Sequence, residues 1–253
     1  GKFAGTTKFP LPASREGICY VASGISGSNR FSANLRAAGY DHLIIRGQSK
    51  RPVYLLIQDD RVELCDASSL WGNKDTYETT DELRSAYPGC GVMCIGEAGE
   101  RQVNFALAIT DRHSSMGRNG FGAVMGSKNL KAIACAGSQQ IQLADKKGFH
   151  DASTKQFELI DESMLKVGFD TFGTNMVADF VHVRGGYPTR NWQQGTFEGI
   201  DDVNAQAIMD SVFVEGTRCH ACPITCGRGT EIQEGKWKGA KGEGPEYEST
   251  KTL

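Results

Sequence analysis

Three cysteines that lie close together near the end of the chain have the clearest chemical potential. Cys219, Cys222 and Cys226 follow a C-x2-C-x3-C spacing within the run RCHACPITCGR at residues 218–228. This spacing can bring three thiolates round one point on a tight loop, as a metal ion or an iron–sulfur cluster requires. The run therefore predicts a metal site whose fourth ligand lies outside it.

Zinc is the main rival to an iron–sulfur cluster at this run, because Cys and His are its usual ligands. A structural zinc site would need either His220, which is badly placed between two cysteines, or a distant cysteine, since no Cys or His follows Cys226. A four-iron cluster has the same shortage of ligands. A disulfide pair with a spare thiol is the remaining interpretation, and the spacing alone leaves these alternatives open.

A second candidate site is the glycine-rich stretch DRHSSMGRNGFGAVMGSK at residues 111–128. Glycines let backbone N–H groups approach an anion closely, and Arg118 and Lys128 could neutralise phosphate charge. The stretch is neither a P-loop nor a dinucleotide-binding fingerprint, because its glycines follow a G-x-G-x-x-x-G spacing. The spacing alone supports a phosphate cradle and a set of tight turns about equally.

Four blocks of this sequence together resemble the tungsten-containing aldehyde:ferredoxin oxidoreductase family. They are the cysteine run, GEGPEYES at residues 242–249, AGYDHLIIRG at residues 38–47 and GFGAVMGSKNLKAIA at residues 120–134. Four collinear matches are more specific than any single one. Members of this family are more than twice as long, so we expect the chain to be an internal part of such a protein.

The resemblance implies three cofactors. They are a tungsten (or molybdenum) bis-pterin centre, a Mg²⁺ ion that bridges the pterin phosphates, and a [4Fe-4S] cluster. It assigns Cys219, Cys222 and Cys226 to the cluster, with a fourth cysteine expected beyond Leu253.

The resemblance also assigns pterin contacts residue by residue. In the glycine-rich stretch these are Ser114, Ser115, Gly117 and Arg118, and near the N-terminus they are Lys2, Ser26, Ser28 and Phe31. Three of them depart from the family pattern, which has arginine in place of Lys2 and Ser114 and asparagine in place of Ser26. Lysine keeps the charge of arginine but loses its planar fork, so the contact at Lys2 is expected to be weaker.

Two carboxylates in the stretch 244–249 could carry acid–base chemistry. On a helix, Glu246 and Glu248 would point in directions roughly 200° apart, so only one of them can face a buried pocket. The resemblance selects Glu248 as the catalytic group beside the metal, where shielding from water would raise its pKa and suit it to proton transfer. Glu246 is expected at the surface, where it would interact with the helix dipole.

The composition narrows the class of protein. The chain has 253 residues, 39% hydrophobic content and a net charge of -2, which gives no electrostatic reason to expect nucleic acid or an anionic membrane as partner. No apolar run approaches 18 residues, so no membrane span is expected. Eight cysteines without a signal peptide indicate a reducing, cytoplasmic compartment.

The apolar pattern before residue 136 is typical of strands. Short apolar or alternating runs lie at residues 3–9, 42–45, 53–57, 62–65, 92–95, 103–109 and 130–135. Asp59 and Asp60 predict a hairpin turn, and the stretch from Thr79 to Tyr87 predicts one short helix. The isolated cysteines of this part are expected in the core: Cys19, Cys65, Cys90, Cys94 and Cys135.

From Asp145 onward the pattern becomes helical. Apolar residues recur at three-to-four spacing in residues 146–167, 174–183 and 203–214. We therefore predict an α+β protein with a β-sheet-rich domain at residues 1–140 and a mostly helical domain, which contains the cysteine run, at residues 141–253. The resemblance implies the same order, with the sheet domain as the base on which the pterins lie and both domains truncated.

The resemblance implies an oxidoreductase that oxidises a small aldehyde to a carboxylate at the tungsten centre. Electrons would pass through the cluster to ferredoxin or another electron-transfer protein, and a homodimer is compatible with the family. One alternative is another tungsten enzyme on the same scaffold, such as an aromatic acyl-thioester reductase. The other is a non-catalytic iron–sulfur subunit, which the departures at Lys2, Ser26 and Ser114 would suit.

Overall fold

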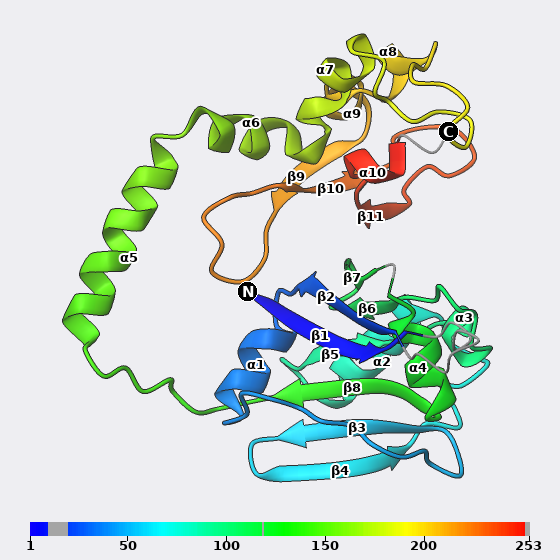
Figure 1. Ribbon diagram of the computed structural model, residues 1–253, viewed down its shortest axis with the longest axis vertical. Helices are drawn as coiled ribbons and strands as arrows, with labels where there is room; N and C mark the ends of the chain where they lie inside the picture. The colour runs from blue at the N-terminus through cyan, green and yellow to red at the C-terminus, as the bar shows by residue number, and fades with distance from the viewer. Residues whose placement is uncertain (10–19, 118, 251–253) are drawn as a thin grey trace. The chain divides into compact units, whose positions relative to one another are not determined.

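The computed structural model describes residues 1–9, 20–117 and 119–250. The chain divides into two compact units, Gly1–Gln142 and Leu143–Leu253, which are taken in turn below. Both units contain helices and strands, which confirms the α+β class (Figure 1). No helix among the described residues is long and apolar enough to cross a bilayer.

The first unit is built on a six-stranded mixed sheet with the strand order β4-β3-β8-β5-β6-β7 (Figure 1). Its strands are β3 (Val53–Gln58), β4 (Arg61–Asp66), β5 (Gly91–Cys94), β6 (Ala108–Thr110), β7 (Ser114–Met116) and β8 (Leu130–Ala136). A separate antiparallel pair is formed by β1 (Lys2–Lys8) and β2 (Val21–Gly27). The helices are α1 (Phe31–Ala37), α2 (Thr76–Ala86), α3 (Glu97–Glu100) and α4 (Phe121–Ser127).

The core of this unit follows from the alternation of side chains along the central strands. Leu55 and Ile57 of β3 belong to one buried cluster with Ile133 of β8, whereas Leu56 and Ala134 belong to a second cluster. Both faces of the sheet are therefore covered. Cys90, Cys94 and Cys135 are buried and free, as expected for core thiols, and burial raises the pKa of Cys94 to about 11.

Local signals explain most of the elements of the first unit. Asp59 takes a positive φ of 50° in the tight hairpin between β3 and β4, as predicted. Helix α2 begins three residues earlier than predicted because Asp75 caps it, with the Asp75 carboxylate accepting from Glu78 N at 2.8 Å. The predicted strand at residues 42–45 is wrong, since this extended segment has no ladder partner within the described chain.

The second unit begins with α5 (Lys146–Asp161) and α6 (Met164–Phe172). The short helices η1 (Gly173–Val177), α7 (Ala178–Val183), α8 (Ile200–Val203) and α9 (Ala205–Ser211) follow. A three-stranded antiparallel sheet with the order β11-β10-β9 comes next, formed by β9 (Phe213–Thr217), β10 (Gly227–Glu231) and β11 (Lys241–Glu243). Helix α10 (Tyr247–Thr250) ends the described part.

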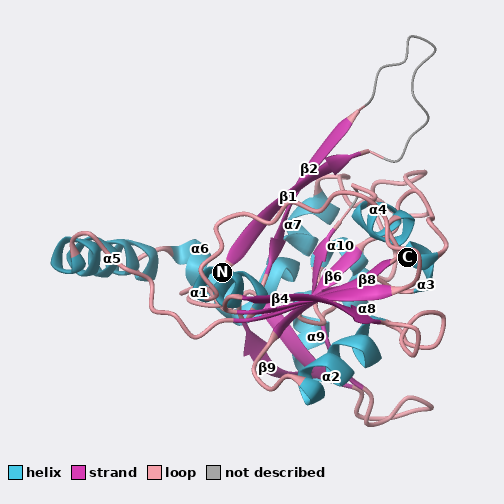
Figure 2. Ribbon diagram, turned by 90° about the horizontal axis from the view of Figure 1, so that it is seen from below, coloured by secondary structure: helices cyan, strands magenta, loops and turns pink. Residues whose placement is uncertain are grey.

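The helical prediction for residues 203–214 was wrong at its end, where β9 begins at Phe213 (Figure 2). Tertiary pairing decides this, because Phe213 lies opposite Thr230 and Thr217 lies opposite Gly227 in the ladder with β10. The small sheet carries the cysteine run between two of its strands. The sheet therefore positions the cysteine run, and the helical pattern of the sequence did not predict this sheet.

Candidate functional site

The N-terminal residues predicted to contact a pterin gather at one end of the β1–β2 pair. Lys2 lies opposite Gly27 in the ladder, and Phe3 lies opposite Ser26. The main-chain N–H of Ser28 donates to the carbonyl of Gly1 at 3.0 Å, and α1 starts three residues later at Phe31. The structure thus brings Lys2, Ser26, Ser28 and Phe31 together.

Asp111, the first residue of the glycine-rich stretch, ties this end to the six-stranded sheet. Its Oδ2 accepts from Ser28 Oγ at 2.8 Å and from the main-chain N–H groups of Arg30 and Phe31, both at 2.9 Å. Its Oδ1 accepts from Arg84 Nη2 at 2.9 Å and from Val92 N at 3.1 Å. One carboxylate therefore joins the start of α1, helix α2 and strand β5.

The rest of the glycine-rich stretch lies beside β2. Thr110 pairs with Ser114 across the β6–β7 ladder and receives a hydrogen bond from Ser26 Oγ at 3.4 Å. Further along, Asn119 Nδ2 donates to Ser23 O at 3.2 Å. The structure therefore places Ser114, Ser115 and Gly117 on strand β7 and its end, next to the N-terminal group, whereas Arg118 lies outside the described residues.

The side chains of this region differ in what they can offer a ligand. Ser26, Ser28 and Phe31 are at most 2% exposed, and Ser28 Oγ is already committed to Asp111 and to Ser32 N, from which it accepts at 3.0 Å. Lys2 and Ser115 are exposed. An anion at this end could therefore meet the Lys2 ammonium, the Ser115 hydroxyl and main-chain N–H groups, while the buried serines hold the turn in shape.

Burial by itself raises the pKa of Asp111, because a carboxylate loses hydration inside the protein. The hydrogen bonds from Phe31 N, Arg30 N, Ser28 and Val92 N outweigh this effect, so the pKa of Asp111 lies below its ordinary value. Asp111 is thus a fixed negative charge at neutral pH. Asp111 carries no functional signal in the sequence, although it opens the glycine-rich stretch and takes a positive φ of 52°.

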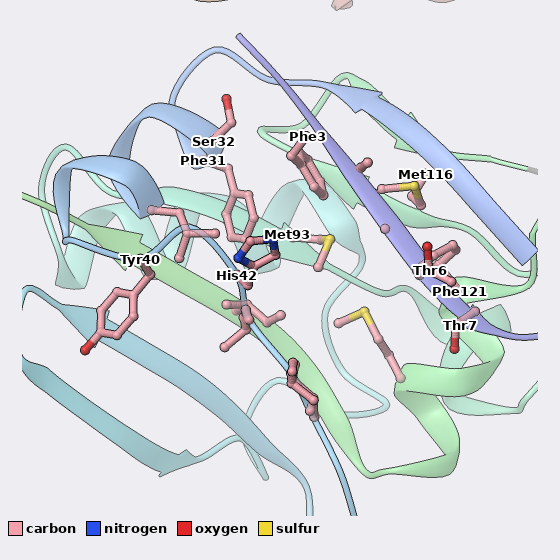
Figure 3. Close-up of a pocket in the computed structure, with 18 of the residues that line it drawn as sticks. Phe3, Thr6, Thr7, Phe31, Ser32, Tyr40, His42, Met93, Met116 and Phe121 are labelled. Atoms are coloured by element: carbon pink, nitrogen blue, oxygen red, sulfur yellow. The ribbon is translucent and has the colours of Figure 1, made fainter. Parts of the chain in front are cut away.

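A pocket of about 810 Å³ lies in the first unit between β1 and the extended segment 40–45 (Figure 3). Its lining is mostly apolar, with Phe3 and Phe31 in tilted contact at a ring-centroid distance of 5.2 Å. Met93 lies among the labelled side chains in Figure 3. Of the predicted pterin contacts within the described residues, only Lys2 and Phe31 line the pocket, and the predicted serines lie outside it.

In the second unit, the cysteine run forms the loop between β9 and β10. The base of the loop is closed by the ladder pair of Thr217 and Gly227. Within it, the N–H of Cys222 donates to Cys219 O at 3.1 Å, and Ala221 takes a positive φ of 53° to make the turn. The three thiols are free and half-buried, so they remain accessible to a metal centre.

The loop offers three thiols to a metal centre, one fewer than a structural zinc ion or a four-iron cluster takes. Within the described residues, no three Cys, His, Asp or Glu side chains converge on a point that could hold a single metal ion. The pKa of Cys226 is raised by burial first, then by Glu246 and by the thiols of Cys219 and Cys222.

Arg228 and Asp170 fix the far end of the cysteine loop to the end of α6. Arg228 is 1% exposed, and its guanidinium donates to the carbonyls of Phe169 at 2.7 Å, Asp170 at 3.1 Å, Thr171 at 3.2 Å and, within the loop, Thr225. The Asp170 carboxylate accepts from Thr225 N at 2.6 Å. The arginine thus satisfies carbonyls that end a helix inside the protein.

The residues Gly173, Thr174 and Asn175 connect this anchor to the carboxylate segment. Gly173 has a φ of 63°, and a Cβ built on it would lie 2.7 Å from Cys226 O and 2.8 Å from Arg228 Nε. Thr174 Oγ1 donates to the Glu246 carboxylate, and Asn175 Nδ2 donates to Pro245 O at 2.8 Å. Helix η1 therefore touches the cysteine loop and holds the Glu246 segment.

The two candidate carboxylates differ from the sequence-based expectation. Glu246 is half-buried against Thr174, and its pKa is raised, first by burial and then by the neighbouring charges of Glu248 and Glu243. Glu248 is exposed. Glu246, expected at the surface, is thus the shielded carboxylate within the second unit.

Comparison with known proteins gives two matches to one family. Residues 12–137 match the model of the aldehyde ferredoxin oxidoreductase N-terminal domain, and residues 151–253 match the model of domains 2 and 3 of the same family. The chain belongs to the aldehyde ferredoxin oxidoreductase family. This membership confirms the resemblance that the four sequence blocks carry.

Individual relatives agree with the family assignment. The chain is 38% identical over 256 residues to a tungsten-containing aldehyde ferredoxin oxidoreductase of Pyrococcus abyssi and 32% identical over 245 residues to the WOR-like subunit of an aliphatic sulfonate oxidoreductase of Pyrococcus furiosus. These alignments cover 100% and 90% of the chain, but only 40% and 39% of the relatives. The chain thus spans about 40% of the length of such proteins.

A solved structure shows the same architecture in a different enzyme. The active-site complex BamBC of benzoyl coenzyme A reductase is similar to the chain with a TM-score of 0.66 and 26% sequence identity. The match covers 88% of this chain and 35% of that one.

Replacement of Asp111 by Asn should destabilise the first unit strongly. Asn keeps the size of Asp but loses the charge and one acceptor, which leaves buried donors at the start of α1 unpaired and should cost about 3 kcal/mol or more of unfolding free energy at pH 7. Because the pKa of Asp111 is lower in the folded protein, its contribution is present above about pH 4 and is lost as the pH falls through the folded pKa. Urea unfolding of wild type and variant at several pH values measures both effects.

Asp81→Asn is the matched control for this test. Asp81 pairs with Arg112 at 3.0 Å but is half exposed, so its loss should cost at most about 1 kcal/mol. If Asp111→Asn were no more destabilising than Asp81→Asn, Asp111 would not hold the turn.

Replacement of Gly173 by Ala should destabilise the second unit by about 2 kcal/mol or more. Its φ of 63° and ψ of -156° lie in a region that only glycine adopts readily, and the added methyl group would meet Cys226 O and Arg228. Gly185→Ala is the control, because Gly185 also has a positive φ, of 70°, but a Cβ there would meet nothing within 4 Å. Equal losses of unfolding free energy in the two variants would show that crowding at the cysteine loop is unimportant.

Proposed function

We propose that this chain is part of an enzyme that oxidises an aldehyde to a carboxylate at a tungsten bis-pterin centre and passes the electrons through a [4Fe-4S] cluster to ferredoxin. The observation that carries the proposal is the half-buried loop of Cys219, Cys222 and Cys226 in a chain whose two units both match this family. When bound, the tungsten centre would supply two-electron chemistry and the cluster would supply one-electron transfer.

The residues of the first unit would bind the anionic ends of the pterins. Lys2 contributes a positive charge, and Ser115 and Gly117 contribute a hydroxyl and a main-chain N–H at the edge strand β7. The buried serines Ser26 and Ser28 act indirectly, through the turn that they hold together with Asp111. A Mg²⁺ ion that bridges the phosphates would take oxygen ligands, which main-chain carbonyls near these turns can provide.

Glu248 is the proposed acid–base group. In the described residues it is exposed, so the shielding that a raised pKa requires would come from the cofactor or from other parts of the full-length enzyme. Glu246 would act on Glu248 through its charge. Thr174 holds the half-buried Glu246 carboxylate in place, and the negative charges of Glu246 and Glu248 repel each other.

A different reaction on the same scaffold is the second candidate function. It is favoured by the structural similarity to the benzoyl coenzyme A reductase complex and by the sequence similarity to the sulfonate oxidoreductase subunit. A non-catalytic electron-transfer subunit is the third, because Lys2, Ser26 and Ser114 depart from the family pattern. Tungsten content separates the electron-transfer subunit, which would carry iron alone, from the two enzymes, and a comparison of substrates then separates the two enzymes.

Metal analysis of the full-length protein, purified without oxygen, should find tungsten together with about four irons per chain for one four-iron cluster. Separate replacement of Cys219, Cys222 and Cys226 by Ser should remove most of the iron, because a serine hydroxyl is a poor substitute for a thiolate ligand. Cys90→Ser is the control, since Cys90 is a buried core thiol of the first unit. Zinc in place of iron, or loss of iron in the Cys90 variant, would contradict the assignment.

Replacement of Glu248 by Gln should lower aldehyde-dependent reduction of ferredoxin by roughly 10²- to 10⁴-fold, the usual contribution of a positioned acid–base group. The assay uses the full-length protein without oxygen, with iron and tungsten measured on each variant. Glu234→Gln, at an exposed position of the same unit, should leave turnover unchanged. If Glu246→Gln lowers turnover and Glu248→Gln does not, at equal metal content, the acid–base role belongs to Glu246.

A further inference from the structure

Arg228 is a buried cation two residues after the last cysteine of the loop. It is 1% exposed and lies in β10, the strand that leaves the cysteine loop (Figure 1). Its guanidinium carbon lies 5.3 Å from the centroid of the Phe213 ring, on the neighbouring strand β9. Aromatic and backbone contacts therefore enclose the positive charge beside the proposed cluster.

This charge has no contact ion pair. No carboxylate of the described residues forms a salt bridge with Arg228, and its hydrogen-bond acceptors are all main-chain carbonyls. Two carboxylates act on it from a distance. Asp170 pairs with Lys166 at 2.5 Å and accepts from Thr225 N, and Glu246 accepts from Thr174. Carbonyl dipoles hold the guanidinium in place without cancelling its full charge.

One N–H donor of the guanidinium also lacks a hydrogen-bond acceptor. The Nε–H of Arg228 is buried and has no acceptor among the residues that the structure describes. A Cβ built on Gly173 would meet both this nitrogen and Cys226 O, so the unused donor and the Cys226 main chain border the same small space. The unsatisfied end of the cation is thus on the side of the last cysteine.

We propose that Arg228 is a positioning residue that fixes Cys226 against the end of α6 and, by its buried charge, raises the reduction potential of the cluster. This inference rests on the proposed [4Fe-4S] site. Uptake of one electron makes the cluster more negative by one charge, and a fixed cation nearby stabilises the reduced form more than the oxidised form. A buried charge is screened little by salt, so the effect should persist at high ionic strength.

The loop offers a matched pair of arginines for the test. Arg218 directly precedes Cys219 but is exposed, whereas Arg228 follows Cys226 by two residues and is buried. Both changes, Arg228→Gln and Arg218→Gln, remove one positive charge next to a ligand cysteine. Only the first removes it from a site that solvent does not screen.

The experiment is a potentiometric titration of the full-length protein with dithionite as reductant, in which electron paramagnetic resonance measures the reduced cluster. In Arg228→Gln, the ratio of reduced to oxidised cluster at a fixed potential should fall about tenfold, which corresponds to 59 mV for a one-electron couple. Arg218→Gln should change the ratio less than twofold, and only at low salt. Arg228→Lys, which keeps the charge, should lie close to wild type.

Three outcomes would overturn the inference. One is a wild-type potential in Arg228→Gln at full iron content, and another is an Arg228→Lys variant whose potential falls as far as that of the Gln variant. If Arg228→Gln retains no iron, the reduction potential of Arg228→Lys is compared with that of wild type instead. The third outcome is loss of iron in both variants, which would show that Arg228 has a structural role only. Absence of iron from the wild type would instead refute the proposed cluster itself.

Discussion

Both candidate sites depend on the cost of leaving main-chain groups unpaired where a helix begins or ends inside the protein. At the start of α1 the free N–H groups of Arg30 and Phe31 are satisfied by the carboxylate of Asp111. At the end of α6 the carbonyls of Phe169, Asp170 and Thr171 are satisfied by the guanidinium of Arg228. In each unit a single buried charge of the appropriate sign holds a functional loop.

This solution has an electrostatic consequence for the proposed cofactors. A negative charge at Asp111 lies behind the turn that would meet phosphate, but its five hydrogen bonds, one of them to Arg84, keep that charge compensated. Arg228 is different, because its hydrogen-bond acceptors are all neutral carbonyls and it forms no salt bridge with a described carboxylate. The first unit therefore presents Lys2 to an anion without strong opposition, whereas the second unit places both the Arg228 cation and the Glu246 carboxylate near Cys226.

The sequence predicted where the candidate site residues lie, but it did not predict the residues that hold them in place. Cysteine spacing and four family blocks located the loop and the glycine-rich stretch, because these signals are local. Asp111 and Arg228 could not be recognised in this way, since their partners lie up to 83 residues away and are mostly main-chain atoms that carry no sequence signature. The strand β9 and the positions of Glu246 and Glu248 likewise depend on contacts between segments, which periodicity does not report.

The contacts of Ser26 and the exposure of Lys2 explain how these two departures from the family pattern affect the proposed pterin site. Ser26 is buried, and its hydroxyl donates to Gly27 O at 3.0 Å and to Thr110, so its side chain packs between β2 and β6. A small serine at this position stabilises the junction of the turn and the sheet. The asparagine of the family pattern is the residue that would face a ligand. Lys2 and Ser115 lie on the exposed side, where a flexible ammonium can still reach a phosphate without the planar fork of arginine. The substitution at Ser26 therefore alters the support of the proposed pterin site more than its charge.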